Sequence, residues 1–263
     1  MRRRAIMALA IASLAVPLSA AKCDEAAETL VLATYKLQNE SSTATGLAVR
    51  FETSNGQIRR VLVTANHVLQ QMSGDHCVLV SRIRHNDDTF VRQEITIPIR
   101  DAGRPVWKKH GKHDLGVLPL PAAIEIETVP FDSLVTDEQL AKVHTGDAVR
   151  LAVFPERSEA NRAGFPVLRG GFVASYPVVP AALHPAFLVD TTAWTGDSGG
   201  PVMHANLPSP SGGPLVIGVV RGMRNITDTV KESRFVERRT HYPLGISEVL
   251  HARFVRDVIL ELR

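Results

Sequence analysis

The sequence has little of what small disulfide-stabilised folds require. Its 263 residues include only two cysteines, Cys23 and Cys77, and aromatic residues make up 5%. Two cysteines cannot form a disulfide framework, so the fold must be held by a hydrophobic core. In an oxidising compartment the two could pair and tie the N-terminus to the first half of the chain. The sequence leaves that bridge and two separate thiols equally open.

An excess of charge of one sign is also missing. The chain has 30 Lys and Arg residues against 27 Asp and Glu, and the whole excess lies in Arg2, Arg3 and Arg4. Nucleic-acid binders need a sustained cationic surface that displaces counterions from phosphates. We therefore expect no nucleic-acid partner. The 44% hydrophobic content against 22% charged residues excludes a disordered chain.

No apolar run approaches the length of about 20 residues that a membrane-spanning helix needs. The run from Ala5 to Val16 follows the three arginines and precedes Pro17 and a stretch of small residues that ends at Ala21. This order predicts a secretory signal peptide over residues 1–21, with a retained anchor as the alternative. We expect a periplasmic or secreted protein without a stable membrane anchor after cleavage.

Short runs of β-branched and apolar residues, separated by turn signals, dominate the rest of the chain. Asn55-Gly56 between two of them is typical of a tight hairpin turn. Such a pattern favours an all-β fold, an antiparallel sandwich or barrel, over alternating βαβ units. The expected strands are Leu30–Leu37, Thr45–Phe51, Arg60–Thr64, Val78–Arg84, Gln93–Ile99, Leu115–Leu120, Val149–Phe154, Gly171–Val178, Phe187–Thr192 and Leu215–Val220.

The β pattern lapses between Glu125 and Asp147, which indicates a link between two β units, with a short helix at 137–143. At the C-terminus, Ser247 is a candidate N-cap for an amphipathic helix. Its expected apolar side is formed by Val249, Leu250, Phe254, Val255, Val258 and Ile259.

The strongest local motif is Gly-Asp-Ser-Gly-Gly-Pro at residues 196–201. Glycines beside a serine allow a sharp turn and leave backbone N–H groups free to face an oxyanion. A serine hydroxyl also needs a base that accepts its proton. His67 just beyond an apolar strand and Asp114 at the start of another are candidates for the base and for its partner.

The order His67, Asp114, Ser198, with intervals of 47 and 84 residues, resembles the chymotrypsin-fold serine peptidases, especially compact bacterial members of the HtrA (Deg) type. Nearly the whole mature chain is covered. The further segments that fit the family pattern are Thr45–Val49, Gly146–Val149, Phe154-Pro155, Gly170–Ser175, Asp190 and Ile217–Val220.

The resemblance implies two six-stranded antiparallel β-barrels with the catalytic cleft between them, and a C-terminal α-helix. Residues 22–135 would form the barrel that carries His67 and Asp114, and residues 136–263 the barrel that carries Ser198. The N–H groups of Gly196 and Ser198 would form the oxyanion hole. Neither a metal nor another cofactor is implied, and the expected partners are protein or peptide substrates.

Two alternatives of other kinds remain. The motif around Ser198 also satisfies the Gly-x-Ser-x-Gly elbow of α/β-hydrolases, in which Asp228 with His241 or His251 would complete an esterase triad. That elbow needs a helix after the serine, and Pro201 with the apolar run that follows argues against one. The other alternative is a catalytically inert peptidase homologue that acts as a binding module.

The sequence departs from the family pattern at three places. No PDZ domain follows the final helix, so we expect a monomer or a small oligomer. Thr192, Val220 and Arg221 fall at the expected specificity pocket; no acid lies at its base, which favours small or medium apolar substrate side chains over Lys or Arg. Arg221 could instead point inward and favour an acidic side chain, or be solvated. Asp197 has no recognisable activation terminus to pair with, so we expect an internal Arg, Lys or His to neutralise it, with a loop that only substrate orders as the alternative.

Overall fold

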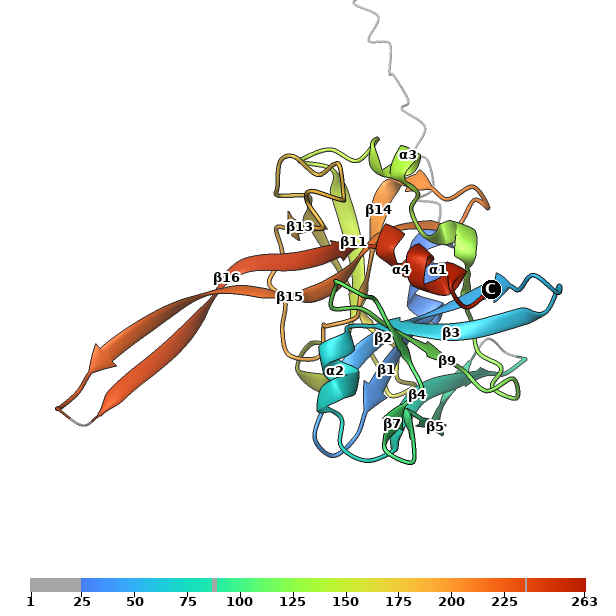
Figure 1. Ribbon diagram of the computed structural model, residues 1–263, viewed down its shortest axis with the longest axis horizontal. Helices are drawn as coiled ribbons and strands as arrows, with labels where there is room; N and C mark the ends of the chain where they lie inside the picture. Colours follow the sequence, from blue (N-terminus) through green and yellow to red (C-terminus); the bar gives the residue numbers. More distant parts are fainter. Residues whose placement is uncertain (1–24, 87–88, 235) are drawn as a thin grey trace, which may run out of the picture.

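The computed structural model describes residues 25–86, 89–234 and 236–263. Its strands form two large sheets, antiparallel throughout except where β10 pairs with β2 (Figure 1). The first sheet has the order β5-β4-β1-β2-β3-β9-β8. Its strands are β1 (Thr34–Gln38), β2 (Thr43–Glu52), β3 (Ile58–Thr64), β4 (His76–Arg84), β5 (Phe90–Pro98), β8 (Lys108–Lys109), β9 (Gly116–Pro119) and β10 (Val129–Pro130).

Six strands of that sheet are longer than two residues, and the two-residue strands β8 and β10 are added to them. A separate hairpin joins β6 (Arg100–Asp101) and β7 (Arg104–Pro105). The second sheet has six strands in the order β12-β11-β14-β15-β16-β13. They are β11 (Ala148–Val153), β12 (Val167–Phe172), β13 (Ala186–Val189), β14 (Pro201–Pro208), β15 (Pro214–Lys231) and β16 (Glu237–His251).

The chain passes from the first sheet to the second between β10 and β11, within the interval where the sequence predicts a link. This connection contains the 3₁₀ turn η1 (Phe131–Ser133) and the helix α3 (Asp137–Leu140). Thr136 caps α3 by accepting a hydrogen bond from the Gln139 backbone, and the Gln139 side chain accepts one from the Thr136 backbone. The short helix predicted here is confirmed, although it ends at Leu140.

The predicted hairpin at Asn55-Gly56 is also confirmed. Gly56 has a φ of +79°, and Thr53 N–H donates to Gln57 O at 2.9 Å to close the turn between β2 and β3.

By contrast, the expected strand at 30–37 is wrong at its start, because residues 25–32 form the helix α1 (Glu25–Leu32). Its two first-turn glutamates suit the positive end of the helix, and a short apolar run does not by itself distinguish helix from strand.

The C-terminal helix is present but begins later than predicted. Helix α4 (Arg253–Leu260) follows β16, and residues 247–251 belong to that strand. Ser247 is fully buried and donates its hydroxyl to Thr191 O at 2.6 Å instead of capping a helix. Pairing with β13 and β15 outweighed the helical spacing of Val249 and Leu250.

The end of β15 and the start of β16 form a long arm, which we define as residues 222–234 and 236–246. It stands away from the body as a two-stranded ribbon (Figure 1). Among the described residues no third strand pairs with the ribbon from Asn225 to Lys231. The sequence predicts β15 only at 215–220, just before the arm. The residues of the arm itself lack a clean alternation of apolar and polar side chains.

Candidate active site

His67 lies in the first turn of the helix α2 (Asn66–Gln71), which directly follows the buried end of β3. The sequence places His67 just beyond an apolar strand, and the structure shows that a helix begins there. The indole Nε1 of Trp107 donates to Asn66 Oδ1 at 2.9 Å and fixes the start of α2. His67 therefore stands on a supported helix, with about a third of its side chain exposed.

Asp114 reaches His67 from the turn that leads into β9. Its Oδ2 lies 2.6 Å from His67 Nδ1, and its Oδ1 accepts a hydrogen bond from the His67 backbone N–H at 2.8 Å. A Cβ at Gly116 would meet Leu69 Cδ1 at 3.0 Å and Trp107 Cδ1 at 3.3 Å. The missing side chain of Gly116 thus lets the start of β9 lie against α2 and brings the two residues together.

The electrostatics of this pair favour a charged Asp114. Burial raises the pKa of Asp114, but hydrogen bonds from the His67 ring and backbone outweigh burial and hold the pKa below its ordinary value. The positive charge of Arg221 acts in the same direction. An ionised Asp114 keeps a proton on Nδ1 of the imidazole and leaves Nε2 free to accept one.

Ser198 lies in a tight turn that is hydrogen-bonded to β2. Gly196 and Gly199 have φ values of +97° and +90°, which side chains disfavour. A Cβ on Gly199 would also collide with Thr45 O and Thr64 Oγ1. Thr45 N–H donates to Ser198 O at 3.0 Å, and Thr45 Oγ1 donates to Gly196 O at 2.7 Å. The serine turn is therefore held by the sheet that also carries His67 and Asp114.

The hydroxyl of Ser198 donates to Arg221 O at 3.3 Å. Within the described chain it makes no hydrogen bond to His67. The structure thus brings His67 and Asp114 into direct contact, and it holds Ser198 in a turn whose backbone is bonded to Thr45 of the same sheet. In unliganded sites a nucleophile and its base are often not yet in hydrogen-bond contact.

The Thr195–Gly196 peptide is held in a defined orientation. Thr195 O accepts a hydrogen bond from Glu156 N–H at 2.7 Å, and in a trans peptide the following N–H points the opposite way. The N–H groups of Gly196 and Ser198 donate to no partner among the described residues. Neither group predicted for the oxyanion hole is therefore occupied by another part of the described chain.

Asp197 is buried, at 1% exposure, and has an internal partner. Its Oδ2 lies 3.1 Å from Arg169 Nη1 on β12 and accepts a hydrogen bond from Trp194 N–H at 2.9 Å. Its Oδ1 has no partner among the described residues. Burial raises the pKa of Asp197 to about 6, against the lowering by Trp194 N–H and Arg169. The predicted internal cation is confirmed as Arg169, whose Nη2 also donates to Thr191 Oγ1 at 3.0 Å.

The three predicted pocket residues lie in different settings. Val220 is 1% exposed and packs in the hydrophobic core, whereas Thr192 is partly buried. Arg221 is about half exposed and pairs with Glu248 at 3.3 Å. Of the two orientations considered for Arg221, the structure shows the solvated one. Only Thr192 and Arg221 are accessible to a ligand in this arrangement.

Sequence reasoning did not single out Glu156, Arg169 or Thr45 for their contacts with the serine turn. Glu156 has a φ of +48°, an unusual backbone state for a residue other than glycine, which the sequence does not signal. The need for a cation near Asp197 was clear from the sequence, but not which of several arginines would supply it.

The α/β-hydrolase alternative is wrong, because Ser198 is followed by β14 and not by a helix. Asp228 and His241 lie on the arm, where His241 Nδ1 contacts Thr227 Oγ1 at 2.8 Å. His251 is fully buried beside the Phe187 ring. None of the three is placed to serve Ser198.

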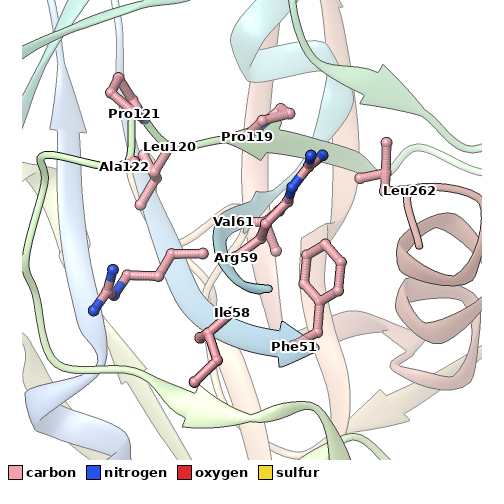
Figure 2. A pocket seen from close by; sticks show the side chains of 10 residues that line it. Phe51, Ile58, Arg59, Val61, Pro119, Leu120, Pro121, Ala122 and Leu262 are labelled. Carbon is pink, nitrogen blue, oxygen red and sulfur yellow. The ribbon is translucent and has the colours of Figure 1, made fainter. Parts of the chain in front are cut away.

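A mainly apolar pocket of about 380 Å³ lies against β2, β3 and the end of β9 (Figure 2). Phe51, Ile58, Pro119 and Leu262 are among its lining residues, and no predicted site residue is. In the part of the chain that the structure describes, no group of three or more His, Cys, Asp or Glu side chains is placed to hold a metal ion. Nor does any described helix have the length and apolarity to cross a membrane.

Comparison with known proteins shows the fold. No family model and no curated protein matches the sequence. Among solved structures, a mutant of human heparin binding protein (CAP37) is similar at 16% identity, over 89% of this chain and 92% of that one, with a TM-score of 0.55. An inactive form of Rv3671c from M. tuberculosis H37Rv is similar at 15% identity over 90% of both chains, with a TM-score of 0.51. This chain has the chymotrypsin-like double β-barrel fold.

Proposed function

We propose that this protein is a serine endopeptidase of the chymotrypsin type that uses His67, Asp114 and Ser198. The observation that supports this most is the His67–Asp114 pair, in which two hydrogen bonds fix the imidazole. A structural ion pair would not require a glycine-rich serine turn with two unbonded N–H groups beside it. Together these features match the chemistry of acyl transfer.

In the proposed mechanism, Ser198 Oγ first leaves Arg221 O and turns toward Nε2 of His67. His67 takes the hydroxyl proton as Oγ attacks the scissile carbonyl, and later returns it to the leaving amine. Asp114 stabilises the imidazolium formed between these steps. The N–H groups of Gly196 and Ser198 donate to the oxyanion, and each contributes about 3 kcal/mol to its stabilisation. Water then hydrolyses the acyl-enzyme by the same route.

We further propose that the mature protein acts outside the cytoplasm, after cleavage of the signal peptide over residues 1–21. That segment and Cys23 lie outside the described residues. Cys77 is buried in the first sheet at the start of β4. The bridge to Cys23 and two separate thiols are therefore both still open, and mass analysis of the exported protein with and without reductant would decide between them.

An inert homologue that works as a binding module is the second candidate. The bond from Ser198 Oγ to Arg221 O favours it, because a serine held there is not activated. The two candidates differ in one respect that is simple to measure. Only an active peptidase forms a covalent adduct with a fluorophosphonate at Ser198.

We expect the mature protein to cleave denatured proteins after small or medium apolar residues such as Ala, Val and Leu. The reason is that Thr192, a small neutral residue, lies at the expected base of the pocket, and that none of the three predicted pocket residues is acidic. The charge of Arg221 is directed to Glu248. Sequencing the peptides released from a denatured protein mixture gives the preference. A majority of cuts after Lys or Arg would contradict this pocket assignment, and the Ser198→Ala variant should release no peptides.

A further inference from the structure

A cluster of charged residues joins the first sheet to the loop between β11 and β12. Lys36 on β1 is 6% exposed, and its ammonium group donates to Glu159 Oε1 at 2.8 Å and to Arg157 O at 3.0 Å. Arg92 on β5 donates to the other carboxylate oxygen of Glu159. Both cations come from the first sheet, whereas Glu159 and Arg157 belong to the loop.

The ionisation of Glu159 is set by these contacts. Burial raises the pKa of Glu159, but hydrogen bonds from Arg92 and Lys36 outweigh it and hold the pKa below its ordinary value. A buried ammonium and a partly buried carboxylate that satisfy each other are costly to separate. The pair therefore holds the loop to the first sheet at one fixed place.

A second contact holds the far side of the same loop. The guanidinium of Arg82 on β4 donates to Gly164 O at 3.0 Å and lies over the Phe165 ring at 4.5 Å. Gly164 has a φ of +86°, and a Cβ there would press on Val80. The loop is thus fixed to the first sheet at both 157–159 and 164–165.

The fixed loop is the one that orients the oxyanion hole. Glu156 N–H donates to Thr195 O, and Glu156 directly precedes the residue whose carbonyl accepts from Lys36. The adjacent Phe154 O lies so close to Gly196 that a side chain on Gly196 would collide with it. Any shift of residues 154–157 would therefore change the direction of the Gly196 N–H.

We propose that Lys36 and Glu159 are positioning residues for the oxyanion hole. By holding Arg157 and its neighbours to the first sheet, the pair keeps Glu156 N–H on Thr195 O and the Gly196 N–H aimed at the reacting carbonyl. Neither residue touches the substrate. This inference rests on the proposed peptidase function and adds that the geometry of the hole depends on a contact between the two barrels.

The test compares the labelling kinetics of Lys36→Met, Glu159→Gln and the double variant with those of the unaltered protein, using an alkyl fluorophosphonate probe. Its phosphoryl oxygen occupies the oxyanion hole, so the rate of covalent labelling reports on the hole, whereas the concentration for half-saturation reports on binding. Loss of one oxyanion donor lowers turnover by about 10²–10³, and misorientation should lower the labelling rate by about tenfold or more. Half-saturation and thermal unfolding of the double variant should change little.

The double variant keeps the test available if a single one fails to fold, because it leaves neither member of the pair charged and unpaired. The labelling rate of the double variant should be no lower than the lower of the two single-variant rates, since the two residues act as one unit. Arg50→Met is the matched control: Arg50 is a cation of the same sheet that donates to Thr128 O at 2.8 Å, and its loss should leave the rate unchanged.

A labelling rate in the double variant equal to that of the unaltered protein would overturn the inference. So would a loss that only follows the folded fraction, or an equal loss in Arg50→Met. If the unaltered protein is not labelled at Ser198, the proposed peptidase function fails first. The two failures are therefore distinguishable.

Discussion

Asp114→Asn is expected to lower turnover by about 10⁴ while the protein stays folded. The amide has nearly the shape of the carboxylate, but it can present an N–H to the His67 ring and so stabilise the wrong tautomer. It also has no charge with which to stabilise the imidazolium. Peptide hydrolysis and thermal unfolding, measured on the same preparation, test this expectation.

Asp228→Asn is the matched control for that experiment. Asp228 is an aspartate on the arm, where it pairs across the ribbon with Thr240. Its replacement should leave turnover unchanged. Equal losses in the two variants, or a loss only in Asp228→Asn, would mean that Asp114 does not orient His67.

Arg169→Met should destabilise the protein, because it leaves the buried Asp197 carboxylate without its cation. Since the pKa of Asp197 is already about 6, protonation of the carboxyl limits this cost at pH 7 to about 1–2 kcal/mol. The labelling of Ser198 should fall as well, since Asp197 lies between the two N–H groups of the proposed oxyanion hole. The double variant Arg169→Met/Asp197→Asn removes the charge on both sides. It should recover most of the stability, because an Asn oxygen can still accept the Trp194 N–H bond. Urea unfolding at neutral pH gives the free energy of unfolding of the unaltered protein, the single variant and the double variant.

The same contact implies that no proteolytic activation is required. A chain that starts at Lys22 with an added Met-Gly should be labelled as fast as the chain that starts at Lys22 itself. Activity that arises only after a further internal cut would show that a new N-terminus, and not Arg169, neutralises Asp197. An Arg169→Met variant as stable as the unaltered protein would lead to the same conclusion.

The placement of His67 and Asp114 at strand ends could be predicted because each residue follows or precedes a strongly apolar strand, whereas their pairing was implied by the resemblance of the order His67, Asp114, Ser198 to the peptidase family. Such strands are recognisable from composition alone, and they fix the position of the residues at their ends. The place of α4 could not be predicted in the same way, because Val249 and Leu250 suit a helix and a strand equally well. There the pairing of residues 247–251 with β13 and β15, which are distant in sequence, decided the outcome.

The contacts that support the serine turn could not be predicted from the sequence for a related reason. Thr45 and Glu156 act through backbone groups or a single hydroxyl, and these contacts cross between the two sheets. Residue type reveals little about such roles. The Lys36–Glu159 pair is similar, because its members lie 123 residues apart and only the folded chain brings them together.

The measurement that tests the peptidase assignment most directly is mass-spectrometric mapping of the fluorophosphonate adduct on the mature protein. We predict one adduct, on Ser198, that is absent from Ser198→Ala and strongly reduced in His67→Ala. A folded protein that forms no adduct on Ser198, or an equal adduct on the Ser198→Ala variant, would contradict the assignment.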